Sequence, residues 1–188
     1  MRSSQTRTAV LGALSIEPMT GYAVREAIRE TLGHFWSESF GQIYPTLAEL
    51  ERDGLVERQG GTRTGSSAFA LTPAGRTELR ALLAEPPQPG APRNGVLLRL
   101  FFGRTLGPEA CAALVRDARD RARQQLTALA AARADHDHAE HAEDSPYWLL
   151  TIAAGEHAAR ATLAWADEAL ATLDALAAGE VGTAPADG

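Results

Sequence analysis

One predicted helix carries polar side chains at its N-terminal end that could bind nucleic acid. In the stretch SFGQIYPTLAELERDGLV, residues Ile43, Leu47 and Leu50 recur at i, i+4 and i+7, the spacing of one buried helix face. Amide and hydroxyl groups beside the positive end of a helix can approach phosphates and base edges. The sequence therefore predicts an exposed DNA-contacting face. Its members are Gln42, Tyr44 and Thr46.

A proline and a glycine delimit this helix. Pro45 has no N–H group, so the regular helix is expected to begin near Gly41 or Gln42. Ser39 and Gln42 form a competing capping-box pattern that would start the helix earlier, and we favour the proline signal. Gly54 is expected to end the helix at a positive φ.

The segment LVERQGGTRTGSSAFALT predicts two short strands around a loop of small polar residues. Phe69 and Leu71 alternate as inward residues, while Arg58 lies on the outer strand. An arginine at a hairpin tip suits phosphate or minor-groove contact. The candidate contacts in this loop are Thr62, Arg63 and Thr64.

Further helices surround these two elements. Short helices are predicted from Thr8 and after Thr20, and another follows Thr72, with Thr20 and Thr72 as N-caps and Pro73 at the first helical position. Three helices followed by a hairpin make a winged helix-turn-helix, whose third helix can enter the major groove of DNA. Weaker candidate contacts, each compatible with an ordinary surface role, are Ser39, Arg58 and Arg25.

Three motifs resemble those of a known family. The segments GALSIEPMTGYAVREAI, SFGQIYPTLAELERDGLVERQ and FALTPAGRTEL are similar to the LxxLxxxPxxGYxI, GxxYPxLxxLExxGLV and YxLTxxGxxxL patterns of the PadR family of bacterial transcriptional regulators. The resemblance covers residues 6 to 84, and it departs from the family at Phe69 and Ala70 in the wing. It implies a regulator whose helical C-terminal region dimerises and shapes an effector cleft.

Composition limits the class of protein. The chain has 188 residues, is 45% hydrophobic and carries a net charge of −6. Residues 1 to 85 hold nine Arg against ten acids and residues 86 to 188 nine against fourteen, so the negative charge lies mainly in the second half. Cys111 is the only cysteine, and no apolar run approaches a membrane span. We expect a cytoplasmic protein with no membrane partner.

The second half is expected to be a helical dimerisation domain. A Pro/Gly linker at residues 86–95 separates a DNA-binding domain, 1–85, from helices in 96–180 and a tail at 181–188. The last predicted helix, Ser145 to Ala178, has apolar residues stepping by three and four. Packing within the chain explains part of this stripe, but we favour a dimer seam. The residues expected there are Leu149, Ile152, Leu163, Leu170 and Leu173.

Two other clusters raise ligand hypotheses. Aromatic and imidazole groups in the second half could line a pocket for a flat or apolar effector, although they could equally be core. These residues are Phe101, Tyr147, Trp148 and His157. The segment ADHDHAEHAED, residues 134 to 144, has metal-binding residue types, but a solvated connection explains the same composition. We expect no metal and no cofactor.

No catalytic motif is recognisable, so we expect no enzyme. The sequence predicts a mainly α protein, with an N-terminal winged helix-turn-helix and a helical C-terminal domain. Its predicted function is a dimeric repressor that binds an inverted-repeat operator in double-stranded DNA and is released by a small aromatic or hydrophobic effector. The alternative is a winged-helix module that associates with proteins and does not bind DNA. A metal-dependent enzyme built on the histidine cluster is a third hypothesis.

Overall fold

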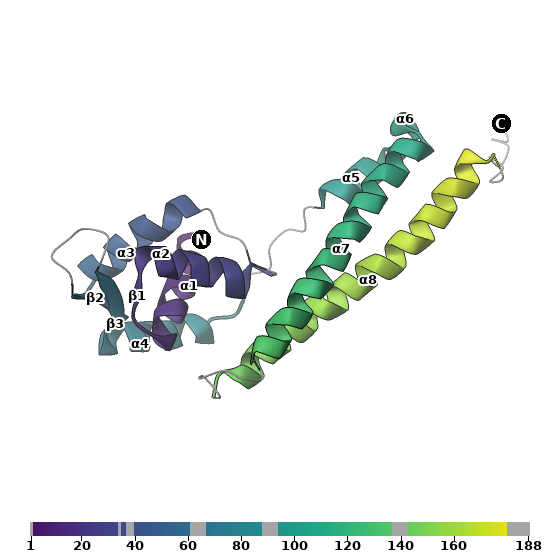
Figure 1. Ribbon diagram of the computed structural model, residues 1–188. Coiled ribbons are helices and arrows are strands. Elements are labelled where there is room, and N and C mark those ends of the chain that lie inside the picture. The colour runs from purple at the N-terminus through teal and green to yellow at the C-terminus, as the bar shows by residue number, and fades with distance from the viewer. Residues whose placement is uncertain are drawn as a thin grey trace. The chain divides into compact units, whose positions relative to one another are not determined.

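The computed structural model describes residues 2–33, 35–36, 40–60, 67–87, 94–136 and 143–179. The chain divides into two compact units, Met1–Gly90 and Ala91–Gly188. The first unit contains α1 (Arg2–Ile16), β1 (Met19–Thr20), α2 (Gly21–Ala27), η1 (Ile28–Leu32), η2 (Phe40–Gln42), α3 (Ile43–Arg52), β2 (Val56–Gln59), β3 (Ala68–Leu71) and α4 (Pro73–Ala84). The second contains α5 (Gly95–Phe101), α6 (Gly103–Leu106), α7 (Pro108–His136) and α8 (Ser145–Ala177) (Figure 1).

Several predicted helix ends of the first unit are confirmed, although α1 begins at Arg2 and not near Thr8, and the second helix continues from Ile28 as a π-helix. The Thr20 side chain accepts a hydrogen bond from the Ala23 N–H at 3.1 Å, and the Thr72 hydroxyl accepts one from the Gly75 N–H at 3.0 Å. Each threonine is therefore the N-cap of its helix. The regular part of α3 begins just after Gln42, as the proline required, and Gly54 follows the helix with φ 72°.

The wing belongs to a three-stranded antiparallel sheet in the order β1-β3-β2. The predicted hairpin corresponds to β2 and β3, whereas β1 was not predicted from the sequence. This strand is two residues long and pairs Met19 with Phe69 and Thr20 with Ala68. Because β3 lies between two strands, the sheet ties the start of α2 to the wing.

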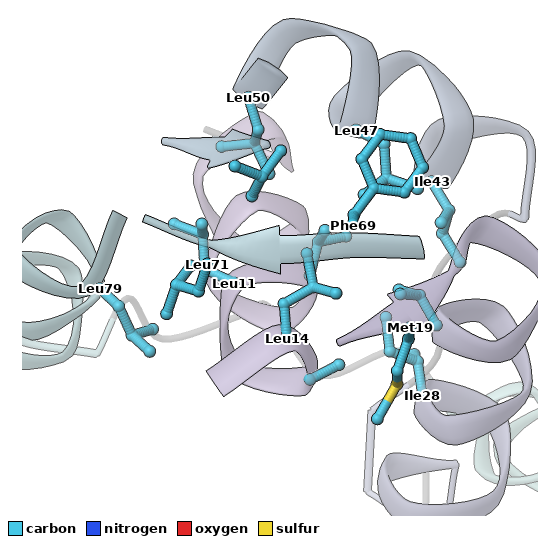
Figure 2. Packing of buried hydrophobic residues seen from close by; sticks show 14 residues of the cluster. Leu11, Leu14, Met19, Ile28, Ile43, Leu47, Leu50, Phe69, Leu71 and Leu79 are labelled. Atoms are coloured by element: carbon cyan, nitrogen blue, oxygen red, sulfur yellow. The ribbon is translucent and has the colours of Figure 1, made fainter. Parts of the chain in front are cut away.

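One hydrophobic core holds the first unit together. Figure 2 shows labelled side chains from α1, α3 and β3 converging on it, among them Leu11, Leu47 and Phe69. Phe69 and Leu71 are buried as predicted, and Ala70 between them is buried as well, so the alternation in β3 is not strict. This core fixes α3 against α1 and the sheet, and so determines which face of α3 stays accessible.

The second unit is built on a long helical hairpin. Arg119 of α7 pairs with Asp167 of α8 at 3.3 Å, and Arg133 pairs with Glu156 at 3.0 Å. The residue farther along α7 pairs with the residue nearer the start of α8, so the two helices are antiparallel. Figure 1 shows them side by side along their length.

The apolar stripe of α8 packs against α7 of the same chain. Ile152 and Leu170 are buried there, together with Ala159 and Ala166, and α7 contributes buried residues such as Val115. Leu149, Leu163 and Leu173 are half-buried, and Leu173 packs against the core of this hairpin. Within one chain, α7 therefore supplies a partner surface for the buried part of this stripe, and a dimer seam along its half-buried residues stays a prediction.

Candidate nucleic-acid interface

The N-terminal end of α3 presents two of the three predicted DNA contacts. Gln42 immediately precedes the helix and is exposed, with no side-chain capping bond, and Tyr44 is 53% exposed. An amide and a phenol are thus accessible where the helix dipole is positive. Both groups can donate and accept hydrogen bonds, as contacts to base edges and phosphates require.

The expectation that Thr46 is exposed was wrong. Its side chain is only 6% exposed and faces the core with Ile43, Leu47 and Leu50. These four positions are i, i+3, i+4 and i+7 of a single helix face. The signal was present in the sequence, since the i+3 position belongs to the same stripe as the leucines.

Tyr44 rests on the first residue of α2. A Cβ atom built on Gly21 would lie 2.7 Å from Cε1 of the Tyr44 ring and 3.3 Å from Cδ1. A distance below 3.0 Å is shorter than real Cβ contacts, so only glycine allows the ring to lie where it does. Gly21 has no positive φ, and its conformation therefore does not explain why it is glycine. This contact was not predicted from the sequence, where Gly21 stands at the expected start of the second helix without any local signal that points to Tyr44.

Arg58, on the outer strand of the wing, is engaged by its own chain. Its Nε donates a hydrogen bond to Glu51 Oε1 at 2.8 Å, and its guanidinium lies 5.1 Å from the centre of the Phe69 ring. The hydrogen bond from Arg58 to Glu51 raises the pKa of the arginine, and the charge of Glu51 acts in the same direction. Arg58 therefore links the last turn of α3 to the wing, and a phosphate would have to compete with Glu51 for it.

The remaining predicted DNA contacts are placed differently. Arg25 is half-buried on α2, with Nε 3.7 Å from Glu26 and its guanidinium 5.9 Å from the centre of the Tyr22 ring. The other four residues lie outside the described part of the chain. They are Ser39, Thr62, Arg63 and Thr64.

The predicted effector cluster is not assembled within the second unit. Tyr147 and Trp148 lie at the start of α8, a helix of 33 residues and thus about 50 Å long. Phe101 is the last residue of α5, and α5 packs against α7. The neighbouring Leu100 packs against the buried cluster that contains Val115 and Leu170. Because α7 and α8 are antiparallel, that cluster lies toward the far end of α8 from Trp148. Phe101 therefore does not share a pocket with Tyr147, Trp148 and His157 within one chain, and their role in effector binding stays a prediction.

The second unit has a cavity elsewhere. A cavity of about 680 Å³ lies among α5, α6, the start of α7 and the last turns of α8. Its wall includes Leu97, Leu100, Trp165 and Leu173. None of the four residues predicted for the effector cluster lines it.

The described residues contain neither a cluster of metal-binding side chains nor a membrane-spanning helix. Residues 137–142, the centre of the histidine-rich segment, lie outside the described residues. In the described ranges there is no group of three or more His, Cys, Asp or Glu side chains that could hold a metal ion. No helix among them has both the length and the apolar character needed to span a membrane.

Family models match both units of the chain. The model of the PadR-like family of transcriptional regulators matches residues 10–81, and the model of the C-terminal region of virulence activator alpha matches residues 92–174. Among curated proteins, the chain is similar to the negative transcriptional regulator PadR of Bacillus subtilis (strain 168). The two are 29% identical over 125 residues, which are 64% of this chain and 69% of PadR.

Solved structures share the fold over most of the chain. A PadR-like transcriptional regulator from Bacillus cereus superposes with a TM-score of 0.76 at 23% identity, covering 90% of this chain and 98% of that one. Bacillus subtilis PadR in complex with operator DNA gives a TM-score of 0.74 at 24% identity, covering 89% and 98%. The same regulator in complex with p-coumaric acid gives 0.71 at 23% identity, again covering 89% and 98%.

Proposed function

Because the chain belongs to the PadR-like family of transcriptional regulators, we propose that it binds operator DNA through α3 and the wing. The observation that carries this proposal is the accessible N-terminal end of α3. There Gln42 is exposed beside the positive helix end, and the Tyr44 ring is seated on Gly21. In a winged helix-turn-helix this end of the third helix is the part that reaches base edges. A family member of the same fold has been solved with operator DNA, which supports the assignment.

Salt dependence tests DNA binding against the alternative of a protein-association module. The full-length protein should bind duplex DNA with an affinity that falls linearly on logarithmic axes as salt rises. The expected slope is about −0.9 per phosphate contacted, because each contact releases condensed counterions. Fluorescence anisotropy with a labelled duplex measures this slope. An absence of binding even at low salt would contradict the proposal and favour the protein-association alternative.

The dimer is proposed to form through α5, because α7 covers much of the α8 stripe, whereas the apolar residues at the end of α5 are more exposed. The outer face of α5 leaves Leu98 and Phe101 exposed, and Phe102 follows immediately after the helix. The rings of Phe101 and Phe102 meet edge to face at 5.1 Å, so these residues form one continuous apolar surface, the α5 patch. With Phe101 82% exposed, the patch offers roughly 400 Å² of apolar area. That is about half of the ~800 Å² that each partner buries in a standard interface.

A charge in the α5 patch tests the dimer. Phe101→Glu should convert the dimer to monomers, because the carboxylate would be buried against an apolar partner surface. Folding should be unaffected, since the Phe101 ring is exposed in the single chain. Leu83→Glu, at a similarly exposed leucine of α4, is the matched control and should remain dimeric. Light scattering that found Phe101→Glu still dimeric would exclude this surface.

The proposed mode of regulation is repression relieved by a small aromatic effector. The curated relative is a negative transcriptional regulator, and that regulator has been solved with p-coumaric acid. Such a ligand can release DNA only if it binds more tightly to the conformation that binds DNA poorly. A DNA-binding regulator acts in the compartment that holds the DNA, which supports the cytoplasmic location expected from the sequence. The family's members named above are regulators, which supports a function without catalysis.

A further inference from the structure

The cavity in the second unit has the size and the lining of a small-molecule site. Its volume of about 680 Å³ lies within the ~300–1,000 Å³ range of typical ligand pockets. Four helices line it: α5, α6, the start of α7 and the last turns of α8. All of its lining residues belong to the described part of one unit, so the pocket does not depend on how the two units are arranged.

The wall of this cavity is apolar and includes an aromatic ring. Trp165 is half-buried and packs against the cluster of Val115 and Leu170, and Leu100 and Leu173 pack against the same cluster. A tryptophan held by such packing offers a fixed indole surface on which an aromatic ligand can stack. The ligand body is therefore expected to be apolar and at least partly aromatic.

A close backbone contact forms part of the same wall. The Cys111 thiol is buried and donates a long hydrogen bond to the Gly103 carbonyl oxygen, with 3.6 Å between Sγ and O. A Cβ atom on Gly103 would lie 2.9 Å from Cys111 Sγ, so glycine at this position allows α6 to lie directly on α7. The cavity is thus bounded here by a tightly packed helix junction.

Two opposite charges complete the lining. Arg104 and Glu168 are both exposed, and in the described residues neither forms an ion pair. Because their charges cancel, a charged ligand would gain no net attraction, yet it would still lose hydration on entering an apolar cavity. The arginine can donate a hydrogen bond, and the glutamate can accept one. This combination favours an uncharged molecule with a hydroxyl or carbonyl group at one end.

We propose that this α5–α8 cavity binds an uncharged aromatic small molecule, with its ring against Trp165 and its polar group between Arg104 and Glu168. This inference deepens the proposed function, on which its regulatory meaning rests, by locating the effector site and naming the class of ligand. A second copy of the chain is not the proposed occupant. Leu97 of the cavity wall precedes Phe101 of the α5 patch by four residues, so the two surfaces adjoin on one helix face, and the experiments below therefore include a second copy among their outcomes.

Binding of an uncharged solvatochromic dye tests the site without DNA, so this proposal and the DNA-binding proposal can fail separately. Nile red should bind the full-length protein saturably with a blue-shifted emission. Thr172→Trp would fill the cavity from an exposed position of its wall and should weaken dye binding by about tenfold or more. Ala171→Trp places the same bulk on the exposed residue beside it, outside the lining, and should bind the dye as the parent does.

Competition tests the class of ligand and the rival occupant. The uncharged 2-naphthol should displace Nile red, whereas 2-naphthoate, with a similar ring system and a carboxylate, should be about tenfold weaker. Equal dye binding by both tryptophan variants would overturn the site, and tighter competition by 2-naphthoate would overturn the uncharged class. A dye affinity that fell as the protein concentration rose would show that a second copy covers the cavity, and it would also overturn the proposal.

Discussion

Gly21→Ala should impair DNA binding while leaving the fold intact. The new methyl group would lie 2.7 Å from Cε1 of Tyr44, and an ordinary van der Waals contact begins at 3.4 Å. The ring must therefore move by at least the difference, 3.4 − 2.7 = 0.7 Å. It is free to do so, because the contact involves the far end of an exposed side chain and not the backbone.

The cost in stability is small for the same reason. Moving an exposed ring breaks little packing, and replacing glycine by alanine in the first turn of α2 contributes up to about 0.5–1 kcal/mol of helix stability. The two effects oppose each other. The free energy of unfolding should therefore change by less than about 1 kcal/mol.

The cost in DNA affinity is larger. A displacement of 0.7 Å stretches a hydrogen bond from Tyr44 beyond the usual range of 2.5–3.2 Å between heavy atoms. Loss of one such bond in each half-site costs about 1 kcal/mol, or about 2 kcal/mol for a dimer. Operator affinity should then fall about thirtyfold.

A double-mutant cycle separates this mechanism from general damage. Fluorescence anisotropy would compare Gly21→Ala, Tyr44→Ala and the double variant on one operator obtained by selection. If Gly21 acts through Tyr44, adding Gly21→Ala to Tyr44→Ala should cause no further loss. The control is Gly12→Ala on α1, where an added Cβ meets nothing within 4 Å and affinity should be unchanged. Additive losses would refute the argument, as would a Gly21→Ala variant that binds like the parent.

Two other predictions concern stability. Gly75→Ala should lower the free energy of unfolding of the first unit by about 2–4 kcal/mol in urea denaturation. The reason is that its Cβ would lie 2.0 Å from the Leu55 carbonyl oxygen, which accepts hydrogen bonds from Thr72. A loss of stability smaller than that of Gly12→Ala would contradict this. The hydrogen bond from Arg133, aided by Arg160, lowers the pKa of Glu156 below its ordinary 4.5 against the opposing effect of burial. The ionised carboxylate contributes its full stability above the pKa of the unfolded state, and this stability is lost as the pH falls through the lowered pKa of the folded state. Glu156→Gln should therefore make the unfolding of the α7–α8 hairpin less sensitive to acid. An unchanged dependence of stability on pH below pH 4.5 would contradict this.

Local signals in the sequence were sufficient for both ends of α3 and for the starts of α2 and α4. Pro45 and Gly54 fix the two ends of α3, because one lacks an N–H group and the other adopts a positive φ. Thr20 and Thr72 identify helix starts through the hydrogen bonds that their side chains accept. These effects depend on a few neighbouring residues, so they can be inferred without tertiary structure.

Features that depend on distant partners were harder to predict. The two residues of β1 form a strand only because β3 lies beside them. The stripe of α8 reads the same whether its partner is α7 or a second chain, and only the fold identifies α7. The placement of Phe101 far from Trp148 follows from the antiparallel hairpin. The seat of Tyr44 on Gly21 joins two helices, and no local pattern encodes it.

Selection of bound sequences from random duplex DNA tests the central claim most directly. The full-length protein should enrich an inverted repeat, with half-sites separated by about one helical turn or a multiple of it. Gln42→Ala should relax the preference at particular positions of each half-site, whereas Gln124→Ala, the same change at an exposed residue of α7, should enrich the parental sequence. Failure to enrich any sequence would contradict the account. So would a Gln42→Ala variant, together with a Tyr44→Ala variant, that selects the same DNA as the parent.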